Sequence, residues 1–583
     1  MVENHLKELT RPSKEFPRNF VPDDLDLSKW ENLEPLFKNL LDRKLDSKEA
    51  LEQWLLDSSE LSAVVSEEVS RRYIAKDCAT DNPELEKAFL HFVTDIAPKV
   101  KPFDSKLDRK FIECPYLNEL DQTRYEVYIR DCRKDIELFR EENIPVQVEI
   151  EKLSQEYNKI FGAMTVNYKG KEYPIPQMAV FLQQKDREIR FETFKLTAER
   201  KLEDAEKLDE LFDKMLKLRV QVAKNAGFDN FVDYQFRSWG RFDYTPEDCL
   251  IFHNAVEKHV LPLTLKMAED RKQGLKIDPL RPWDTGCDRY GRDPLKPFKT
   301  AEELVSGCRE VFGKVDTELG YNFQKMIDLG LLDLDSRKGK VPAGGYQVPL
   351  AEVRLPFILM NAVGIHFDVN TLIHEGGHAF HNFAARDETI HGYRQAPLEF
   401  CEVASMSMEL LSTPYLEAFY SPGDAARARR GHFEQTIGSL PMIAMGDAFQ
   451  HWIYTHPEHT SKERSDYWIS LGKRFGRGID WTGFEEAHRF SWHGIMHFFA
   501  IPFYFIEYGI AQLGALQMWQ NSRKDKKKAI EAYKSALKLG GSRPLPELFK
   551  AANIKFDFSD NIIQPLIAEV TEEVKRQGKL ESR

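Results

Sequence analysis

Helical periodicity runs through most of this chain, and two short stretches show the pattern of β-strands instead. Segments such as residues 26–45 and 131–161 place apolar side chains three and four positions apart, as amphipathic helices do. Residues 164–182 instead alternate apolar and polar side chains around a Lys-Gly pair, which predicts a hairpin. A second strand-like stretch covers residues 340–364. We therefore expect a mainly α-helical fold with a small β-sheet.

The length of 583 residues exceeds that of a typical single domain, which predicts two or more packed lobes. We place the boundary near residue 190, with an N-terminal helical lobe at residues 1–190 and a larger domain at residues 191–583. Residues 276–298 are rich in Pro, Gly and Asp and predict an irregular connection within the second domain.

Composition excludes several classes of partner. The formal net charge of −12 argues against nucleic acid and against an anionic membrane surface. The chain has no apolar run long enough to span a bilayer, and its polar N-terminus lacks the apolar core of a secretion signal. The seven cysteines are scattered without a C-x-x-C pair, which predicts reduced thiols and a cytoplasmic location.

The sequence LIHEGGHAFH at residues 372–381 contains the pattern H-E-x-x-H at His374, Glu375 and His378. It follows the second strand-like stretch, and Asp368 or Asn370 can cap the start of a helix there. At about 100° per residue, the two histidines project from one helical face and can bind a zinc ion together. Glu375 flanks that face, where its carboxylate can accept a proton from a water molecule.

A catalytic zinc ion needs a third protein ligand and one open position. His381 is a poor candidate, because three ligands along one straight helix cannot converge on a tetrahedral ion. The metzincin pattern also fails, because it requires glycine where His381 stands and histidine where Ala384 stands. We expect His381 to be a supporting or packed side chain.

Residues 396–411 offer a better source of the third ligand. Glu399, Glu402 and Glu409 fall on one stripe of an otherwise largely apolar helix. Carboxylates on a buried helix need partners, which a metal and its supporting residues would supply. Periodicity alone leaves Glu399 and Glu402 as alternatives.

Residues 491–512 place His493, His497, Tyr504 and Tyr508 on one helical face, with a kink expected at Pro502. A tetrahedral intermediate of peptide hydrolysis needs preorganised hydrogen-bond donors beside the metal. A histidine and tyrosines directed at the metal would serve, whereas His493 by itself is better interpreted as structural.

Three separated motifs together resemble the oligoendopeptidase F branch of the thimet oligopeptidase family of zinc metallopeptidases. They are TLIHEGGHAFH, LEFCEVASMSMELL and HFFAIPFYFIEYGIAQLGALQMW, in the order that the family has them. The resemblance implies that Glu402, in the segment EVAS, is the third zinc ligand and that Glu399 and Glu409 support the site, with Glu409 the less favoured of the two. The angiotensin-converting-enzyme group uses a similar spacing, so spacing alone does not separate the two groups.

The same resemblance implies roles for residues outside the metal site. His497, Tyr504 and Tyr508 match donors that stabilise the oxyanion, although Ile506 stands where many relatives have a further tyrosine. The segment PAGGYQVP resembles the family's edge strand, which binds peptide through its main chain, and it gives the substrate-binding candidates Gly344, Gly345 and Tyr346. Independently of the family, the loop HGYRQ lies between the ligand helices, so His391, Tyr393 or Arg394 can reach the site, and we select Tyr393 as a substrate contact.

The resemblance further implies a prolate, two-lobed helical metallopeptidase with a deep substrate channel, and residues 191–583 are then its catalytic domain. We expect an endopeptidase that binds one zinc ion and cleaves short peptides. One alternative is a carboxypeptidase or peptidyl-dipeptidase with the same chemistry, which needs a cationic residue to bind the terminal carboxylate. The other is a non-catalytic peptide-binding protein in which the metal has only a structural role. Glu375 favours an enzyme, because a structural clip has no use for a general base. Manganese or cobalt can replace zinc at such ligands.

Two glycines stand inside the predicted metal-binding helix, each unfavourable there by about 1 kcal/mol relative to alanine. Gly376 lies on the apolar stripe opposite the metal, which predicts close packing of a neighbouring helix. Gly377 borders the metal face, where we expect the missing side chain to leave room for substrate or for an adjoining backbone. The three histidines of residues 451–460 lack a carboxylate partner within that segment, and we expect them to be solvent-exposed.

Overall fold

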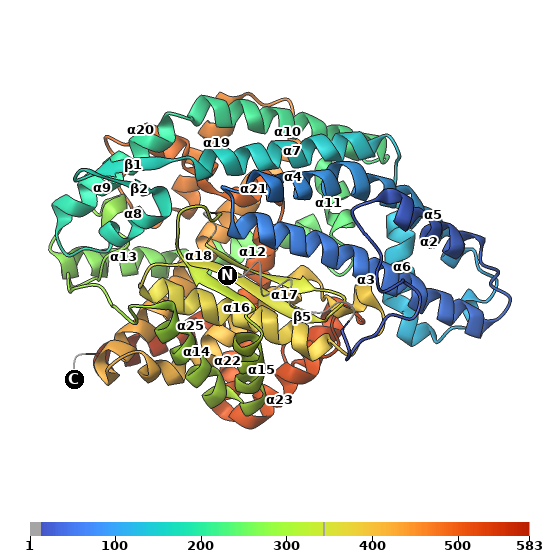
Figure 1. Ribbon diagram of the computed structural model, residues 1–583. Coiled ribbons are helices and arrows are strands. Elements are labelled where there is room, and N and C mark those ends of the chain that lie inside the picture. The colour runs from blue at the N-terminus through green and yellow to red at the C-terminus, as the bar shows by residue number, and fades with distance from the viewer. Residues whose placement is uncertain (1–12, 342–343, 582–583) are drawn as a thin grey trace.

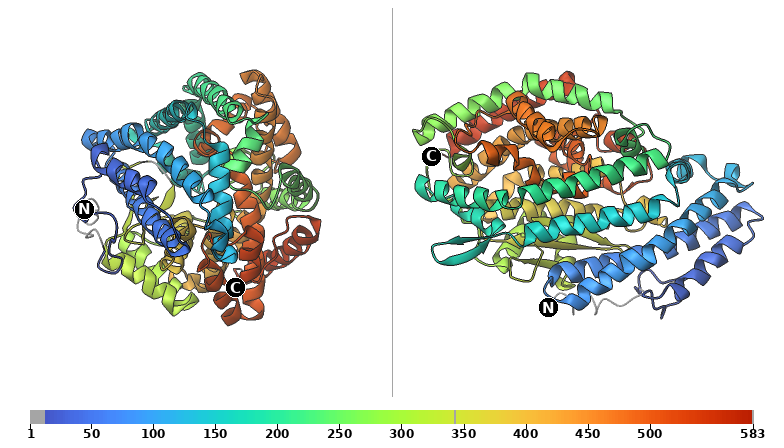
Figure 2. Two further views of the ribbon diagram at one scale, coloured as in Figure 1. Left: turned by 90° about the vertical axis from the view of Figure 1, so that its right-hand side faces the viewer. Right: turned by 90° about the horizontal axis from the view of Figure 1, so that it is seen from above.

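The computed structural model describes residues 13–341 and 344–581, and these residues are mainly helical, as expected. The molecule is elongated in side view (Figure 1) and much rounder along its long axis (Figure 2, left), which agrees with the expected prolate shape. The first helices precede both sheets. They are α2 Trp30–Asp42, α3 Lys48–Cys78, α4 Pro83–His91, α5 Ala97–Ile112, α6 Gln122–Leu138 and α7 Asn143–Gly162.

Eight helices lie between the two sheets, and α7 and α10 pack alongside each other near the top of Figure 1. These helices are α8 Ile175–Leu182, α9 Arg187–Leu202, α10 Ala205–Asn225, α11 Phe231–Ser238, α12 Pro246–His259, α13 Leu261–Leu275, α14 Ala301–Val315 and α15 Thr317–Asp328. Residues 276–298 connect α13 to α14 with only a short 3-10 turn, so the predicted irregular connection is confirmed.

The C-terminal half supplies the helices that surround the candidate site. They are α16 His366–Ala385, α17 Leu398–Ser412, α18 Pro422–Thr455, α19 Ser461–Phe475, α20 Glu485–Arg489, α21 Met496–Ala500, α22 Phe505–Lys524, α23 Lys526–Leu537, α24 Leu545–Ala551 and α25 Asp560–Leu580. Helix α17 packs against α16 and also against α22.

The predicted hairpin consists of β1 Thr165–Tyr168 and β2 Lys171–Pro174, joined at Lys169 and Gly170. Both turn residues have positive φ angles, 52° and 78°, as a two-residue hairpin of this type requires. The strand-like stretch does not continue to residue 182, because residues 175–182 form α8 instead. Pro176 at the start of α8 suits a first helical turn, where a missing N–H costs nothing.

The second sheet has three strands, β3 Leu332–Asp335, β4 Gly345–Leu350 and β5 Leu355–Ala362, in the order β3-β5-β4. β5 pairs with β4 in antiparallel register and with β3 in parallel register. β4 is therefore an edge strand, and it packs against α3 and α16, which lie on either side of the sheet in Figure 1. The sheet lies next to the helix that carries the H-E-x-x-H pattern, as expected.

Residues 491–512 do not form the kinked helix expected from the sequence. α21 ends at Ala500, and α22 begins only at Phe505. Pro502 lacks an N–H and disfavours helical geometry in the residue before it, and Phe503 takes a positive φ of 68°. The backbone amide of Phe503 is satisfied by Gln450 Oε1 at 2.5 Å. The proline thus breaks the helix and lets its two parts point in different directions.

Buried apolar side chains form two main clusters among the described residues. One joins residues from Val21 to Cys132 with Ile390 and Tyr393, and the other runs from Ile74 to Val570. The expected boundary near residue 190 falls inside α9, and we retain it as a proposal. Within the described part of the chain, no helix combines the length and the hydrophobicity that a membrane crossing requires.

Candidate active site

Asp368 fixes the turn between β5 and α16. Its carboxylate accepts hydrogen bonds from the backbone amides of Val363, Gly364 and Ile365 at 2.8, 2.8 and 3.0 Å. Three donors on one carboxylate hold the end of the strand and the first turn of the helix in one arrangement. The N-cap position is Ile365, and Asp368, the third residue of the helix, caps the helix start through its side chain, whereas Asn370 does not.

The three predicted metal ligands converge from two helices. His374 and His378 lie one turn apart on α16, and Glu402 extends toward them from α17. His374 Nε2 lies 3.4 Å from Glu402 Oε2, and His378 Nε2 lies 3.9 Å from Glu402 Oε1. One ligand atom of each residue lies within 4.8 Å of the other two. Two imidazole nitrogens and one carboxylate oxygen form a donor set of catalytic zinc sites, so these residues fit zinc.

Burial and charge set the protonation of the three groups. Burial opposes charge on His374, but Glu402 and Glu409 raise its pKa well above the usual value. Burial lowers the pKa of His378 to about 4, so its imidazole is neutral. Burial would raise the pKa of Glu402, but His378 and His374 lower it to about 2. A neutral imidazole and an ionised carboxylate are the forms that bind a cation, so His378 and Glu402 are already in that form, whereas His374 must release a proton when a metal binds.

Glu409 supports the site directly, although the sequence favoured Glu399 for this role. His374 Nδ1 lies 2.7 Å from Glu409 Oε1. Glu399 instead accepts a hydrogen bond from Tyr244 at 2.7 Å and lies 3.8 Å from Arg241. The predicted ranking of Glu399 above Glu409 as a supporting residue is therefore reversed, because the last turn of α17, not its first, lies beside His374 Nδ1.

Sequence reasoning missed His432, which extends this network from α18. Its Nε2 lies 3.6 Å from Glu409 Oε2, and its Nδ1 lies 3.4 Å from the amide nitrogen of Asn370. In the sequence, His432 stands in a segment rich in arginine, with no spacing that relates it to the metal motif. Only the packing of α18 on α16 and α17 brings it here.

Glu375 is 6% exposed and lies on α16 between the two histidines. Burial raises the pKa of its carboxyl to about 7, against the lowering effect of His374. The backbone of Gln347 on the edge strand β4 lies close to this carboxyl group and also lowers its pKa. A carboxyl group whose pKa lies near neutral pH suits a general base.

The two glycines of α16 meet different neighbours. A Cβ on Gly376 would lie 2.5 Å from the ring of Phe312 on α14, so the prediction of close packing on this face is confirmed. A Cβ on Gly377 would lie 2.5 Å from Ser405 Cα and 2.7 Å from the carbonyl oxygen of Ala404. The sequence predicted that Gly377 leaves room either for substrate or for an adjoining backbone, and the structure shows the backbone of α17 in that place.

The broken helix separates the roles of Tyr504 and Tyr508. The Tyr504 hydroxyl donates a hydrogen bond to Glu402 Oε1 at 2.7 Å. The Tyr508 hydroxyl instead lies 3.1 Å from His497 Nε2. Burial lowers the pKa of His497 to about 4, so its imidazole is neutral. Tyr504 therefore orients the carboxylate of Glu402, whereas His497 and Tyr508 form a separate pair.

The three predicted substrate-binding residues at the start of the edge strand have different surroundings. Gly344 is exposed, and the space that a Cβ would fill there is open. A Cβ on Gly345 would lie 2.7 Å from Thr371 Cγ2, so this glycine lets β4 approach α16. The Tyr346 hydroxyl donates to Asp77 Oδ2 at 2.9 Å, which directs the side chain toward α3. Only the main chain of Tyr346 is thus available to a peptide. Residues 342–343 of the same motif lie outside the described residues.

Tyr393 does not face the site. It is 2% exposed, and its hydroxyl donates to the carbonyl oxygen of Arg124 at 2.9 Å and accepts from the backbone amide of Tyr128 at 3.0 Å. The predicted substrate contact is replaced by packing against the N-terminal helices. From the same loop, His391 and Arg394 line a cavity of about 260 Å³ with His378.

Three further histidines pack in the protein interior, whereas His456 is exposed as expected. His493 lies 3.0 Å from Asp209, which agrees with its structural interpretation. His381 is buried against Phe400 and lies outside the ligand group. His451 contradicts the expectation of an exposed segment, because its side chain is 12% exposed and lies 3.3 Å from Asp447, one turn earlier on α18. The expectation considered only residues 451–460 and so missed this carboxylate.

A second group, Cys249, Asp447 and His451, also places one ligand atom of each residue within 4.8 Å of the others. Asp447 is fully buried and lies 2.9 Å from His253 Nε2. The His374 group differs from this second group in having the adjacent buried carboxylate of Glu375. A buried carboxylate next to three convergent metal donors, beside an open strand edge, defines the site of a metallopeptidase.

Comparison with known proteins agrees with this class. The chain belongs to peptidase family M3, whose model matches residues 180–566, and a model of the peptidase M3 N-terminal domain matches residues 24–139. An oligoendopeptidase F homolog of Borreliella burgdorferi is 25% identical over 562 residues, covering 90% of this chain and 88% of the relative. The oligopeptidase PepF of Bacillus subtilis is 25% identical over 319 residues, covering 51% and 44%.

Solved structures show the same fold. PZ peptidase A with an inhibitor superposes with a TM-score of 0.91 at 26% identity, covering 96% of this chain and 99% of that chain. The oligoendopeptidase F of Enterococcus faecium superposes with a TM-score of 0.63 at 16% identity, covering 95% and 98%. The relatives and structures named oligoendopeptidase F place this chain with that branch of the family.

Proposed function

We propose that this protein is a zinc-dependent endopeptidase that cleaves internal bonds of short peptides. The observation that carries the proposal is the position of Glu375, buried between two histidines that converge with Glu402. A purely structural metal site has no need for a carboxylate held beside it. The names of the relatives support the substrate class, because they describe oligopeptidases and oligoendopeptidases.

In this proposal His374, His378 and Glu402 hold one zinc ion. When bound, the ion supplies a Lewis acid that polarises the scissile carbonyl and lowers the pKa of a water molecule. Glu375 accepts the proton of the attacking water and then donates it to the leaving amine. Glu409 holds the ring of His374 in orientation, and Tyr504 does the same for the carboxylate of Glu402.

His497 and Tyr508 are the proposed donors to the oxyanion that forms at the carbonyl carbon. They lie 3.1 Å apart and come from α21 and α22, on the two sides of the break at Pro502. The substrate backbone adds to the free edge of β4, where Gly344 leaves open space. The backbone of Gln347 lies beside Glu375, so the proposed general base is close to this edge.

We also propose a cytoplasmic location. The seven cysteines, all of which the structure describes, are free thiols, and six of them are buried. Reduced cysteines of this kind are typical of proteins in a reducing compartment.

The test is hydrolysis of an internally quenched peptide that is blocked at both ends. We expect cleavage by the zinc-loaded protein, loss of cleavage after chelation, and recovery when one equivalent of zinc is returned. Cleavage only of peptides with a free end would support a carboxypeptidase or peptidyl-dipeptidase instead. Zinc binding without hydrolysis of any peptide would support the non-catalytic alternative.

A further inference from the structure

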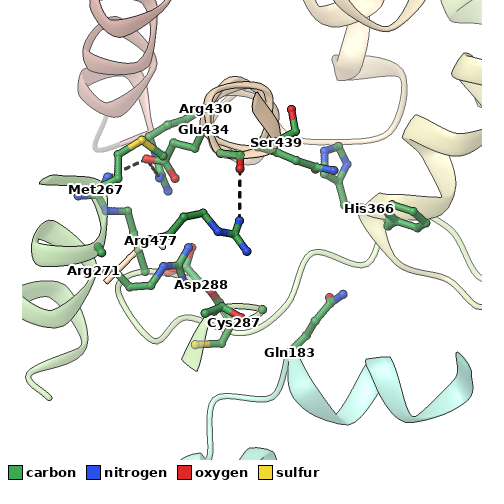
Figure 3. Close-up of a pocket in the computed structure, with 18 of the residues that line it drawn as sticks. Gln183, Met267, Arg271, Cys287, Asp288, His366, Arg430, Glu434, Ser439 and Arg477 are labelled. Carbon is green, nitrogen blue, oxygen red and sulfur yellow. Dashed lines mark hydrogen bonds and ion pairs between the residues drawn. The ribbon is translucent and has the colours of Figure 1, made fainter. Parts of the chain in front are cut away.

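A large cavity opens beside the first turn of α16 and has no role in the chemistry described above. Its volume is about 650 Å³, and its walls come from α13, α18 and the irregular connection at residues 276–298 (Figure 3). His366, Phe367 and Asn370 of α16 line one side. The cavity therefore shares a helix with the metal ligands.

The walls of this cavity carry an excess of positive charge. Five arginines line it, but only two carboxylates do, those of Asp288 and Glu434. Both carboxylates are already engaged. Asp288 pairs with Arg292 at 2.8 Å and Arg427 at 2.9 Å, and Glu434 pairs with two further arginines at 2.8 Å each.

Arg271 and Arg477 remain without an acidic partner among the described residues. Arg271 donates to the backbone carbonyl of Cys287 at 2.6 Å and more weakly to that of Asp284 at 3.4 Å. Arg477 donates to the backbone carbonyl of Gly438 at 3.5 Å, and Figure 3 shows both side chains reaching into the same space. Burial and the charge of Arg271 lower the pKa of the Arg477 guanidinium. Two half-buried like charges in one cavity are unfavourable until an anion joins them.

A peptide bound along β4 would run alongside α16, and the cavity lies at the N-terminal end of α16. Gly345 lies against Thr371 and Gln347 against Glu375, so β4 and α16 run in the same direction past the metal ligands. His366 precedes His374 by two turns of helix, which is about 12 Å along the axis. An extended peptide covers that distance in roughly four residues.

We propose that Arg271 and Arg477 bind a carboxylate of the peptide substrate, about four or more residues from the bond that is cleaved. This inference rests on the proposed function and names a feature of the substrate. The carboxylate can be the C-terminus of the peptide or the side chain of an aspartate or glutamate, since both offer two oxygens to a guanidinium. If the C-terminus is bound, the cavity also limits how long the peptide beyond the cleaved bond can be.

The test compares peptides of one sequence that differ only in charge. One has a free C-terminal carboxylate and one a C-terminal amide. A third set of amides carries a single aspartate or asparagine at successive positions on either side of the cleaved bond. We expect the zinc-loaded enzyme to show about a tenfold or larger gain in kcat/KM for the free acid over the amide, or for aspartate over asparagine at one position. The arm that shows the gain identifies the source of the carboxylate.

Substitution then assigns the gain to the two arginines. The double variant Arg271→Gln with Arg477→Gln should reduce the acid-to-amide ratio to below about threefold, and Arg477→Lys should retain part of it because the charge remains. Arg309→Gln is the matched control, because Arg309 is exposed on α14, away from the cavity, and donates a hydrogen bond to Gln324 at 3.0 Å. Its ratio should equal that of the unmodified enzyme, and thermal unfolding should show that all variants fold.

Three results would overturn the proposal. They are the absence of any carboxylate preference in the unmodified enzyme, an unchanged preference in the double variant, and equal losses on charged and neutral peptides. Failure of the proposed function is a different result, namely no hydrolysis of any peptide. In that case the binding of acid and amide peptides, followed by fluorescence anisotropy with the zinc-loaded Glu375→Gln variant, still decides whether the cavity recognises a carboxylate.

Discussion

The backbone of Ser405 lies so close to Gly377 that a Cβ at residue 377 would be only 2.5 Å from Ser405 Cα. This contact allows α17 to pack directly on the metal-binding face of α16. The same approach brings Glu402, one turn before Ser405, to the two histidines. Gly377 is thus the reason that two helices can share one set of metal ligands.

Gly377→Ala should weaken metal binding and hydrolysis together. The new methyl group meets backbone atoms, which cannot move aside as a flexible side chain can, so α17 must shift and carry Glu402 with it. We expect a loss of about 1–3 kcal/mol in the free energy of unfolding as well. Gly376→Ala is the matched control, because its methyl group meets the ring of Phe312 on the other face. Gly376→Ala should lower stability while bound zinc stays near one equivalent, and equal loss of zinc from both variants would show that the Gly377 contact has no special role.

Glu409→Gln should weaken zinc binding by about 10- to 100-fold, because His374 loses the carboxylate that holds its ring. Glu399→Gln is the control on the same helix. It removes a partner of Tyr244 and Arg241 and should change thermal stability more than zinc affinity. Competition with a chromophoric chelator measures the zinc affinity of both variants. A larger effect from Glu399→Gln would restore the ranking suggested by the sequence.

The two tyrosines should differ when each loses its hydroxyl. Tyr508→Phe removes a proposed oxyanion donor, and kcat should fall by about 10²- to 10³-fold with zinc fully retained. Tyr504→Phe removes the hydrogen bond to Glu402 and should reduce zinc affinity. Zinc titration beside steady-state kinetics separates the two effects. If Tyr504→Phe bound zinc normally but lost kcat, Tyr504 would be the donor and the assignment would be reversed.

His497 should act as a neutral donor across the working pH range. Burial disfavours its charged form and lowers the pKa to about 4, so protonation occurs only below about pH 5. The ratio of kcat/KM between the unmodified enzyme and His497→Gln should therefore be constant from pH 5 to pH 8. The measurement is a pair of pH profiles with one peptide. A ratio that changes around pH 6 to 7 would mean that the charged imidazole takes part.

The metal-binding helix could be predicted from the sequence because its information is local. The spacing of His374 and His378 determines that they share a face whatever surrounds them. The family motif added Glu402, which periodicity alone did not separate from Glu399. The structure brings Glu402 to the histidines by a contact between α16 and α17 that depends on Gly377.

Features that depend on long-range packing could not be predicted in the same way. Tyr393 stands in a loop between two ligand helices, yet it packs against α6, which is distant in the sequence. The separate roles of Tyr504 and Tyr508 depend on the positive φ of Phe503, which a helical wheel cannot represent. Arg271 and Arg477 lie more than 200 residues apart and come together only through the packing of the connection at residues 276–298.

The central claim is that Glu375 is the general base of a zinc-dependent hydrolysis, and Glu375→Gln tests it most directly. The amide keeps the size of the side chain but cannot accept the proton, so the variant should bind zinc as the unmodified enzyme does. We expect kcat for an internally quenched, doubly blocked peptide to fall by at least about 10²-fold. Bound zinc is measured by atomic emission on the same samples. A variant that retains zinc and cleaves at the unmodified rate would contradict the mechanism.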